Sequence, residues 1–147
     1  DYSQAGYYFV TVCTKERRKL LSNIVGGGFY AAPDIELTII GKEIIKTIDF
    51  IDNQHPNVFF DKYIIMPNHI HLIIILGGHG NPPLHTIIGQ LKSYTNKKYN
   101  DMNKTRNILL WQRNYYEHVI RNQQEYEKIY EYMETNPIKW EDDEYYV

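Results

Sequence analysis

Two histidines separated by one residue, His69 and His71, are the first candidates for chemistry in this chain. They begin an apolar run that ends at Leu76 and has the composition of a buried β-strand. Side chains alternate between the two faces of a strand, so both imidazoles point to one side, roughly 7 Å apart. They can share a metal ion, or they can be strand-end histidines that hydrogen-bond to neighbouring backbone. The pair alone leaves both interpretations open.

A tyrosine and an amide near the end of the chain form a second candidate group. Asn122 is a potential N-cap, and a helix beginning there would run to about Thr135, before Pro137. Helical periodicity places four side chains on its buried stripe: Tyr126, Ile129, Tyr130 and Met133. Tyr132 lies roughly 110° from the middle of that stripe, and Asn136 follows one turn later on the same flank. Such a pair can be ordinary surface side chains, or a nucleophilic phenol beside a metal-binding amide.

Hydrophobic patterns predict the elements that position these residues. Strands are expected at 7–13, 58–66, from 69 onward and at 115–120, and helices at 38 to about 53, 84 to about 99, and 122 to about 135. The segment after the charged turn that follows Cys13, with its glycines at 26–28, predicts a flexible loop, and regular structure is expected to resume near Leu37. The resulting order β-α-β-β-α-β is typical of an α+β, ferredoxin-like fold with an antiparallel sheet and two helices on one face. The last helix is an addition to that pattern.

Composition limits the class of protein. A chain of 147 residues with 43% hydrophobic residues predicts a single globular domain over 1–147. Cys13 is the only cysteine, which excludes a disulfide within one chain and favours a cytoplasmic setting. Its apolar surroundings predict a core residue. No apolar stretch approaches the roughly 20 residues that cross a bilayer, so we expect no membrane association.

Charge is distributed unevenly along the chain, whose net charge is −2. Residues 121–147 hold eight acidic and three basic residues, which leaves +3 on residues 1–120. Basic side chains gather at 15–19 and at 92–106, the second group interleaved with Tyr94 and Tyr99. Bases beside aromatic rings suit single-stranded nucleic acid, although an ordinary solvated face has the same composition.

Three segments, taken in order, resemble a known family. They are Met-Pro-Asn-His-Ile-His-Leu at 66–72, Trp-Gln-Arg-Asn-Tyr-Tyr-Glu-His-Val-Ile-Arg-Asn at 111–122, and Tyr-Met-Glu-Thr-Asn-Pro-Ile-Lys at 132–139. Together they resemble the REP-associated tyrosine transposases, a branch of the HUH single-strand transposases that use one catalytic tyrosine. The resemblance extends from Tyr7 to Pro137, nearly the whole chain.

The resemblance implies a role for each candidate residue. His69, His71 and Asn136 would bind Mg²⁺ or Mn²⁺, and Tyr132 would attack a phosphate of single-stranded DNA that neighbours a hairpin. The products would be a 5′-phosphotyrosine and a free 3′-hydroxyl, which a later 3′-hydroxyl could rejoin. His118 is also typical of the family. The tyrosine helix would serve its own subunit or a partner's, in a monomer or a homodimer.

Basic residues outside the catalytic group become candidates for DNA phosphate contacts under this interpretation. They are Lys15, Arg17, Arg18, Lys92, Lys97, Lys98, Arg113 and Arg121. Two alternative functions fit the same residues. One is a non-catalytic relative that binds hairpin DNA in a regulatory role, and the other is a metal-dependent phosphoesterase that uses water instead of Tyr132.

Overall fold

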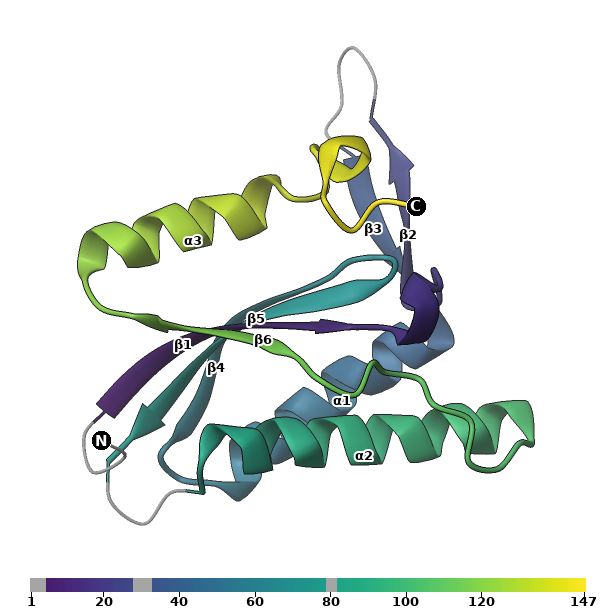
Figure 1. The fold of residues 1–147 in the computed structure, drawn as a ribbon, viewed down its shortest axis with the longest axis horizontal. Helices are drawn as coiled ribbons and strands as arrows, with labels where there is room; N and C mark the ends of the chain where they lie inside the picture. Colours follow the sequence, from purple (N-terminus) through teal and green to yellow (C-terminus); the bar gives the residue numbers. More distant parts are fainter. Residues whose placement is uncertain (1–4, 28–32, 79–81) are drawn as a thin grey trace.

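The structure, a computed structural model, describes residues 5–27, 33–78 and 82–147. Its main sheet has the strand order β4-β5-β1-β6, with all neighbours antiparallel. These strands are β1 (Ala5–Cys13), β4 (Val58–Ile65), β5 (His69–Gly77) and β6 (Tyr116–Ile120). Helices α1 (Ile39–Gln54) and α2 (Leu84–Asn103) cover one face, while α3 (Gln123–Thr135) lies over the other (Figure 1). The predicted ferredoxin-like fold with an added C-terminal helix is confirmed.

Both faces of the sheet carry a hydrophobic core, because helices cover both. Ile70, Leu72 and Ile74 of β5 belong to the larger core beneath α1 and α2. Ile73, one residue out of phase, packs with Met133 of α3 in a smaller core on the opposite face. Burial on two sides explains the continuous apolar run of β5. Within the described part of the chain, no helix is long and apolar enough to cross a membrane.

Side-chain caps fix the beginnings of two helices as predicted. The Thr38 hydroxyl accepts a hydrogen bond from the Gly41 backbone N–H at 3.2 Å, and the Asn122 amide oxygen accepts one from Glu125 N–H at 2.8 Å. Helix α2 continues beyond its predicted end near residue 99. Asn100 stabilises this extension, since its amide nitrogen donates to the Ile108 carbonyl and its amide oxygen accepts from the Ile108 N–H.

The predicted flexible loop between the turn after Cys13 and about Leu37 is wrong in part, because two strands lie within it. Strands β2 (Ser22–Gly26) and β3 (Pro33–Leu37) form a separate two-stranded antiparallel sheet. Ile24 faces Ile35 across the pair, and the single proline stands at the first position of its strand, where it disrupts the ladder least. Residues 28–32 of the predicted loop lie outside the described residues.

Helix α3 docks on the sheet through a narrower apolar stripe than its sequence predicts. Met133 is fully buried and Ile129 packs beside it, but Tyr130 is 40% exposed, so its predicted burial is wrong. The Tyr130 ring instead lies 4.1 Å from the ammonium of Lys62 on β4. Lys62 also pairs with Glu134 of α3. These contacts attach the helix to the β4 side of the sheet.

Two glycines in helices provide a matched test of the packing. A Cβ at Gly41 would lie 2.2 Å from the backbone oxygen of Leu21, whereas one at Gly89 would meet nothing within 4 Å. We expect Gly41→Ala to lower the free energy of unfolding by about 1–3 kcal/mol, because the backbone must shift. Gly89→Ala should raise it by about 0.5–1 kcal/mol through helix propensity. Urea denaturation measures both, and an unchanged midpoint for Gly41→Ala would contradict the close approach.

Candidate active site

His69 and His71 lie on the face of β5 that α3 covers. Both side chains are buried, and their ring centroids are 4.6 Å apart. In the antiparallel register of β1 and β5, Cys13 stands opposite His69 and Thr11 stands opposite His71. The prediction that the two imidazoles share one face is therefore confirmed.

The ring of His69 is oriented by the residue before it. Its Nδ1 lies 2.8 Å from the side-chain oxygen of Asn68. The amide nitrogen of Asn68 already donates to the carbonyls of Arg17 and Tyr145, at 3.3 and 2.6 Å. The amide oxygen therefore faces His69, and Nδ1–H donates to it. This tautomer leaves a lone pair on His69 Nε2.

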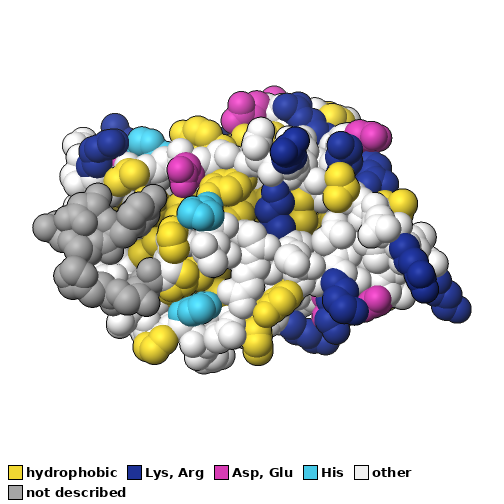
Figure 2. Space-filling view, turned by 60° about the horizontal axis from the view of Figure 1, so that its bottom comes forward, with side chains coloured by type: hydrophobic (Ala, Val, Ile, Leu, Met, Phe, Trp, Pro, Cys, Tyr) yellow, Lys and Arg dark blue, Asp and Glu magenta, His cyan; other side chains and the backbone are white. Residues whose placement is uncertain are grey.

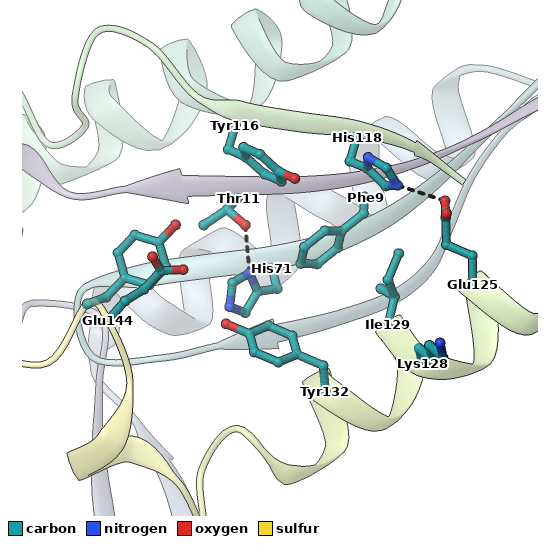
Figure 3. Close-up of a pocket in the computed structure, with 11 residues that line it drawn as sticks. Phe9, Thr11, His71, Tyr116, His118, Glu125, Lys128, Ile129, Tyr132 and Glu144 are labelled. Atoms are coloured by element: carbon teal, nitrogen blue, oxygen red, sulfur yellow. Dashed lines mark hydrogen bonds and ion pairs between the residues drawn. The ribbon is translucent and has the colours of Figure 1, made fainter. Parts of the chain in front are cut away.

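Thr11 of β1 plays the same part for His71. Its hydroxyl oxygen lies 2.8 Å from His71 Nδ1 and can accept the Nδ1–H bond, which leaves a lone pair on Nε2 (Figure 3). The Phe9 ring stacks against the imidazole at a centroid distance of 5.3 Å. The His71 ring is thus fixed from β1 in both position and tilt.

Burial keeps both imidazoles neutral. Desolvation lowers the pKa of His69 to about 4, against a smaller opposing effect of the Asp143 carboxylate. Desolvation also lowers the pKa of His71 well below 6.5, and the neighbouring His69 lowers it further. Neutral imidazoles have the lone pairs that a metal ion requires, so no proton must be displaced at pH 7.

Asn136 comes directly after α3 and brings an amide beside both imidazoles. It is buried, and its Nδ2 donates to the Asp143 carboxylate at 2.6 Å. A carboxylate only accepts hydrogen bonds, so this contact fixes the amide with its oxygen turned away from Asp143. The same Asp143 oxygen lies 4.0 Å from His69 Nε2.

Three acceptor atoms in this cluster are buried without a hydrogen bond to any described residue. They are His69 Nε2, His71 Nε2 and Asn136 Oδ1. Each such atom costs about 1–3 kcal/mol of stability unless something binds it. Among the described residues, no three His, Cys, Asp or Glu side chains form a metal site by themselves. Two imidazoles and one amide oxygen do fit a divalent cation that keeps further positions for water and phosphate.

Tyr132 projects from α3 toward the histidines, next to the buried anchor Met133. Its ring centroid lies 5.3 Å from that of His71 and 6.2 Å from that of Phe9 (Figure 3). Burial, and then the nearby charges of Asp143 and Glu144, raise the pKa of the Tyr132 hydroxyl well above 10. The side chain is therefore a neutral phenol at pH 7, with its hydroxyl in the same cavity as His71.

The segment after α3 completes the site, and sequence reasoning missed it. The ring centroids of Tyr145 and His69 are 4.5 Å apart, and the Arg17 guanidinium carbon lies 5.5 Å from the centroid of the Tyr145 ring. The only feature of the sequence that pointed to Asp143 and Glu144 was the excess of acidic residues at the end of the chain. No feature of the sequence pointed to Thr11, because its contact with His71 depends on the register between β1 and β5, which local patterns do not predict.

Cys13 lies near the site but lacks the properties of a nucleophile. Burial raises the pKa of its thiol to about 11. The Cys13 side chain is only partly buried, whereas the sequence predicted a core residue. A thiol with so high a pKa carries almost no thiolate at pH 7, so Cys13 is poorly suited to nucleophilic attack.

The candidate DNA-contacting bases do not form one surface. Lys15 and Arg17 begin and end a short 3₁₀ turn after β1, and Arg17 is close enough to His69 to lower its pKa. Lys92, Lys97 and Lys98 lie on α2, across the sheet from α3. Figure 2, which views the side of α1 and α2, shows dark-blue side chains toward its right-hand end. Lys92 donates to the carbonyls of residues 112 and 113, which gives it a structural contact. Arg113 and Arg121 are exposed.

Solved structures of similar fold belong to transposases. A REP-associated tyrosine transposase bound to a REP hairpin matches with a TM-score of 0.65 and 23% identity, covering 92% of this chain and 68% of that one. A candidate transposase from Deinococcus radiodurans matches with a TM-score of 0.55 and 14% identity, covering 88% of each chain. At these identities the similarity shows a shared fold.

Sequence comparison establishes the family. A protein of Haemophilus influenzae, described as uncharacterized, is 33% identical over 165 aligned residues, which cover all of this chain (100%) and 88% of that protein. A family model described as "Transposase IS200 like" matches residues 2–136, from before β1 to Asn136. The resemblance drawn from the three segments is thereby confirmed, and the chain belongs to the IS200-like transposase family.

Proposed function

We propose that this protein is a metal-dependent transposase that cuts and rejoins single-stranded DNA through Tyr132. Membership of the IS200-like family supports DNA cleavage and strand transfer as the class of reaction. The observation that carries the finer proposal is the position of Tyr132, 5.3 Å from His71 by ring centroids, beside three buried and unpartnered acceptor atoms. A phenol nucleophile and a cation site in one cleft are what phosphoryl transfer requires.

The chemistry of the chain's own residues follows from this arrangement. The Tyr132 hydroxyl oxygen attacks phosphorus and forms a Tyr–O–P bond as its proton passes to solvent. The bond from phosphorus to the 3′-oxygen of the preceding nucleotide breaks, and that oxygen takes up a proton to become a 3′-hydroxyl. One phosphodiester replaces another, so the reverse attack by a 3′-hydroxyl rejoins DNA without an external energy source. Helix α3 keeps the phenol oriented through the buried Met133.

His69, His71 and Asn136 would hold Mg²⁺ or Mn²⁺. Such an ion supplies positive charge to the scissile phosphate as negative charge builds on its oxygens. Thr11, Asn68 and Asp143 orient the three ligand side chains through the hydrogen bonds described above.

The proposed substrate is single-stranded DNA next to a hairpin. One structure of similar fold is bound to a REP hairpin, and this chain covers 92% of its own length in that match. Among the bases predicted to contact DNA, Arg17 is a candidate for a phosphate near Tyr132, because its guanidinium lies against Tyr145 beside the site. A non-catalytic relative would bind the same DNA without forming a covalent adduct.

Loss of the Tyr132 hydroxyl tests the nucleophile. Labelled hairpin oligonucleotides with a randomised single-stranded flank are incubated with protein and Mg²⁺ or Mn²⁺, and covalent adducts are separated on a denaturing gel. We expect an adduct with the wild type and none with Tyr132→Phe. Tyr130→Phe, on the exposed flank of the same helix, is the matched control and should form the adduct normally. DNA cut by Tyr132→Phe into hydrolysed fragments would support the water-dependent alternative instead.

Metal affinity tests the ligands without any cleavage. Mn²⁺ binding is measured by electron paramagnetic resonance, and His71→Ala should abolish specific binding, whereas His55→Ala, between α1 and α2, should not change it. Thr11→Val keeps the shape of the side chain but removes the acceptor for His71, so affinity should fall about 10- to 100-fold. Equal binding by wild type and His71→Ala would overturn the site.

The pH dependence of that affinity follows from the lowered histidine pKa values. Protons compete with the cation only below the pKa of the folded imidazoles, which burial holds under 6.5 and near 4 for His69. Mn²⁺ affinity should stay level as the pH falls to about 6 and decline as it approaches about 4. A decline centred at pH 6.5, the ordinary histidine value, would show that the imidazoles are not buried as described.

A further inference from the structure

A cavity adjoins both Tyr132 and the proposed metal ligand His71. Its volume is about 520 Å³, within the range of about 300–1,000 Å³ in which proteins bind small ligands. It lies between β6 and α3, and its lining includes Tyr132 and His71 themselves (Figure 3). The cavity thus opens onto the proposed nucleophile, yet the proposed mechanism leaves most of this space unused.

Strand register connects the cavity to the catalytic residues. Tyr116 of β6, Thr11 of β1 and His71 of β5 face one another in a single row across the sheet. In the adjacent row, His118 of β6 faces Phe9 of β1. The cavity floor therefore continues directly from the metal-binding row, and a DNA strand with its phosphate at Tyr132 would place a neighbouring nucleoside over these side chains.

The floor of the cavity is aromatic. Phe9 contacts Tyr116 edge to face, at a centroid distance of 6.2 Å and an interplanar angle of 73°. Tyr116 lies on β6, the edge strand of the main sheet, and is 54% exposed. An exposed ring supported from below by a second ring is a surface on which a nucleobase can stack.

The polar side chains that line the cavity suit a nucleobase better than a phosphate. His118 Nε2 lies 2.7 Å from Glu125 Oε1, and the backbone N–H of Arg121 donates to the same oxygen at 3.2 Å. Both bonds fall on Oε1, so Oε2 has no partner among the described residues. Glu144 places a second carboxylate in the lining, and Lys128 adds one ammonium. Carboxylates repel a phosphate but accept hydrogen bonds from the amino group of a base.

We propose that this cavity binds an unpaired nucleobase beside the scissile phosphate, stacked on Tyr116 and hydrogen-bonded through an amino group to Glu125. The site would select among bases at one position of the DNA and would hold the strand in line with Tyr132. This inference rests on the proposed function, because that function brings the DNA strand to Tyr132. The simpler role of His118 and Glu125, a tie between β6 and the start of α3, predicts no dependence on the base.

Base stacking is tested by fluorescence in the presence of a chelator, where no cleavage occurs. The probe is a short oligothymidylate with one central 2-aminopurine, whose emission falls when it stacks on an aromatic ring. We expect wild-type protein to quench the probe and Tyr116→Ala to bind it about 5- to 150-fold more weakly without quenching. Tyr116→Phe should restore both. Phe59→Ala, an exposed aromatic on β4 outside the cavity, is the matched control and should behave as wild type.

Replacement of the 2-aminopurine by an abasic site separates base binding from phosphate binding. The wild type should lose affinity for the abasic probe, while Tyr116→Ala should bind both probes equally. Equal binding of both probes by the wild type would overturn the proposal and assign the cavity to the DNA backbone. Quenching that Tyr116→Ala leaves intact would overturn it as well.

Glu125→Gln tests the amino-group contact. Glutamine keeps a side-chain oxygen for the start of α3, so the helix is retained, but it replaces an acceptor-only carboxylate with an amide. Wild type should bind a probe with a central cytosine about 5-fold or more tightly than all-thymine DNA, and Glu125→Gln should lose that preference. An unchanged preference would contradict the contact.

The two proposals can fail independently. Normal quenching without a Tyr132 adduct would refute the proposed function alone, whereas an adduct without base dependence would refute only the cavity assignment.

Discussion

The main constraint on this structure is the burial of three polar acceptor atoms that have no hydrogen-bond partners among the described residues. His69 Nε2, His71 Nε2 and Asn136 Oδ1 make no hydrogen bond with the part of the chain that the structure describes. Burial of such atoms is unfavourable, so the surrounding fold must supply the stability that holds them in place. It does so through two hydrophobic cores, one on each face of the sheet. The smaller core matters most for the site, because it carries α3 and therefore Asn136.

Strand register determines which residues can meet in this arrangement. A shift of one residue between β1 and β5 would move Thr11 away from His71 and turn the histidine row toward α1 and α2. The continuous apolar character of β5 does not by itself choose between these registers, since both of its faces are buried. Polar contacts on the α3 side favour the observed register. Histidines that faced the larger core would lack the Thr11 hydroxyl and the Asn68 amide that orient them.

Local patterns in the sequence predicted the four strands of the main sheet and the three helices, but they missed β2 and β3. The spacing of His69 and His71 predicts a shared face, and the cap at Asn122 predicts where α3 begins, since both are short-range effects. Long-range contacts were not predictable in the same way. Tyr130 has the spacing of a core residue, but Lys62 of a distant strand holds its ring at the surface. The partnership of Asp143 with Asn136 likewise depends on how the chain folds back after α3, for which the sequence offers only a run of acidic residues.

The neutral ligand set explains how an acidic neighbourhood can accept DNA in the proposed mechanism. Two imidazoles and one amide carry no charge, so a divalent cation bound by them would keep its full charge for the phosphate. Asp143 is close enough to His69 to influence its pKa, yet its carboxylate is directed to the Asn136 amide. Asp143 and Glu144 also raise the pKa of Tyr132. Without a cation, the phenol keeps its proton and the two carboxylates would repel a phosphate. In the proposed mechanism, the nucleophile and the substrate site would therefore become competent under one shared condition, the binding of a cation.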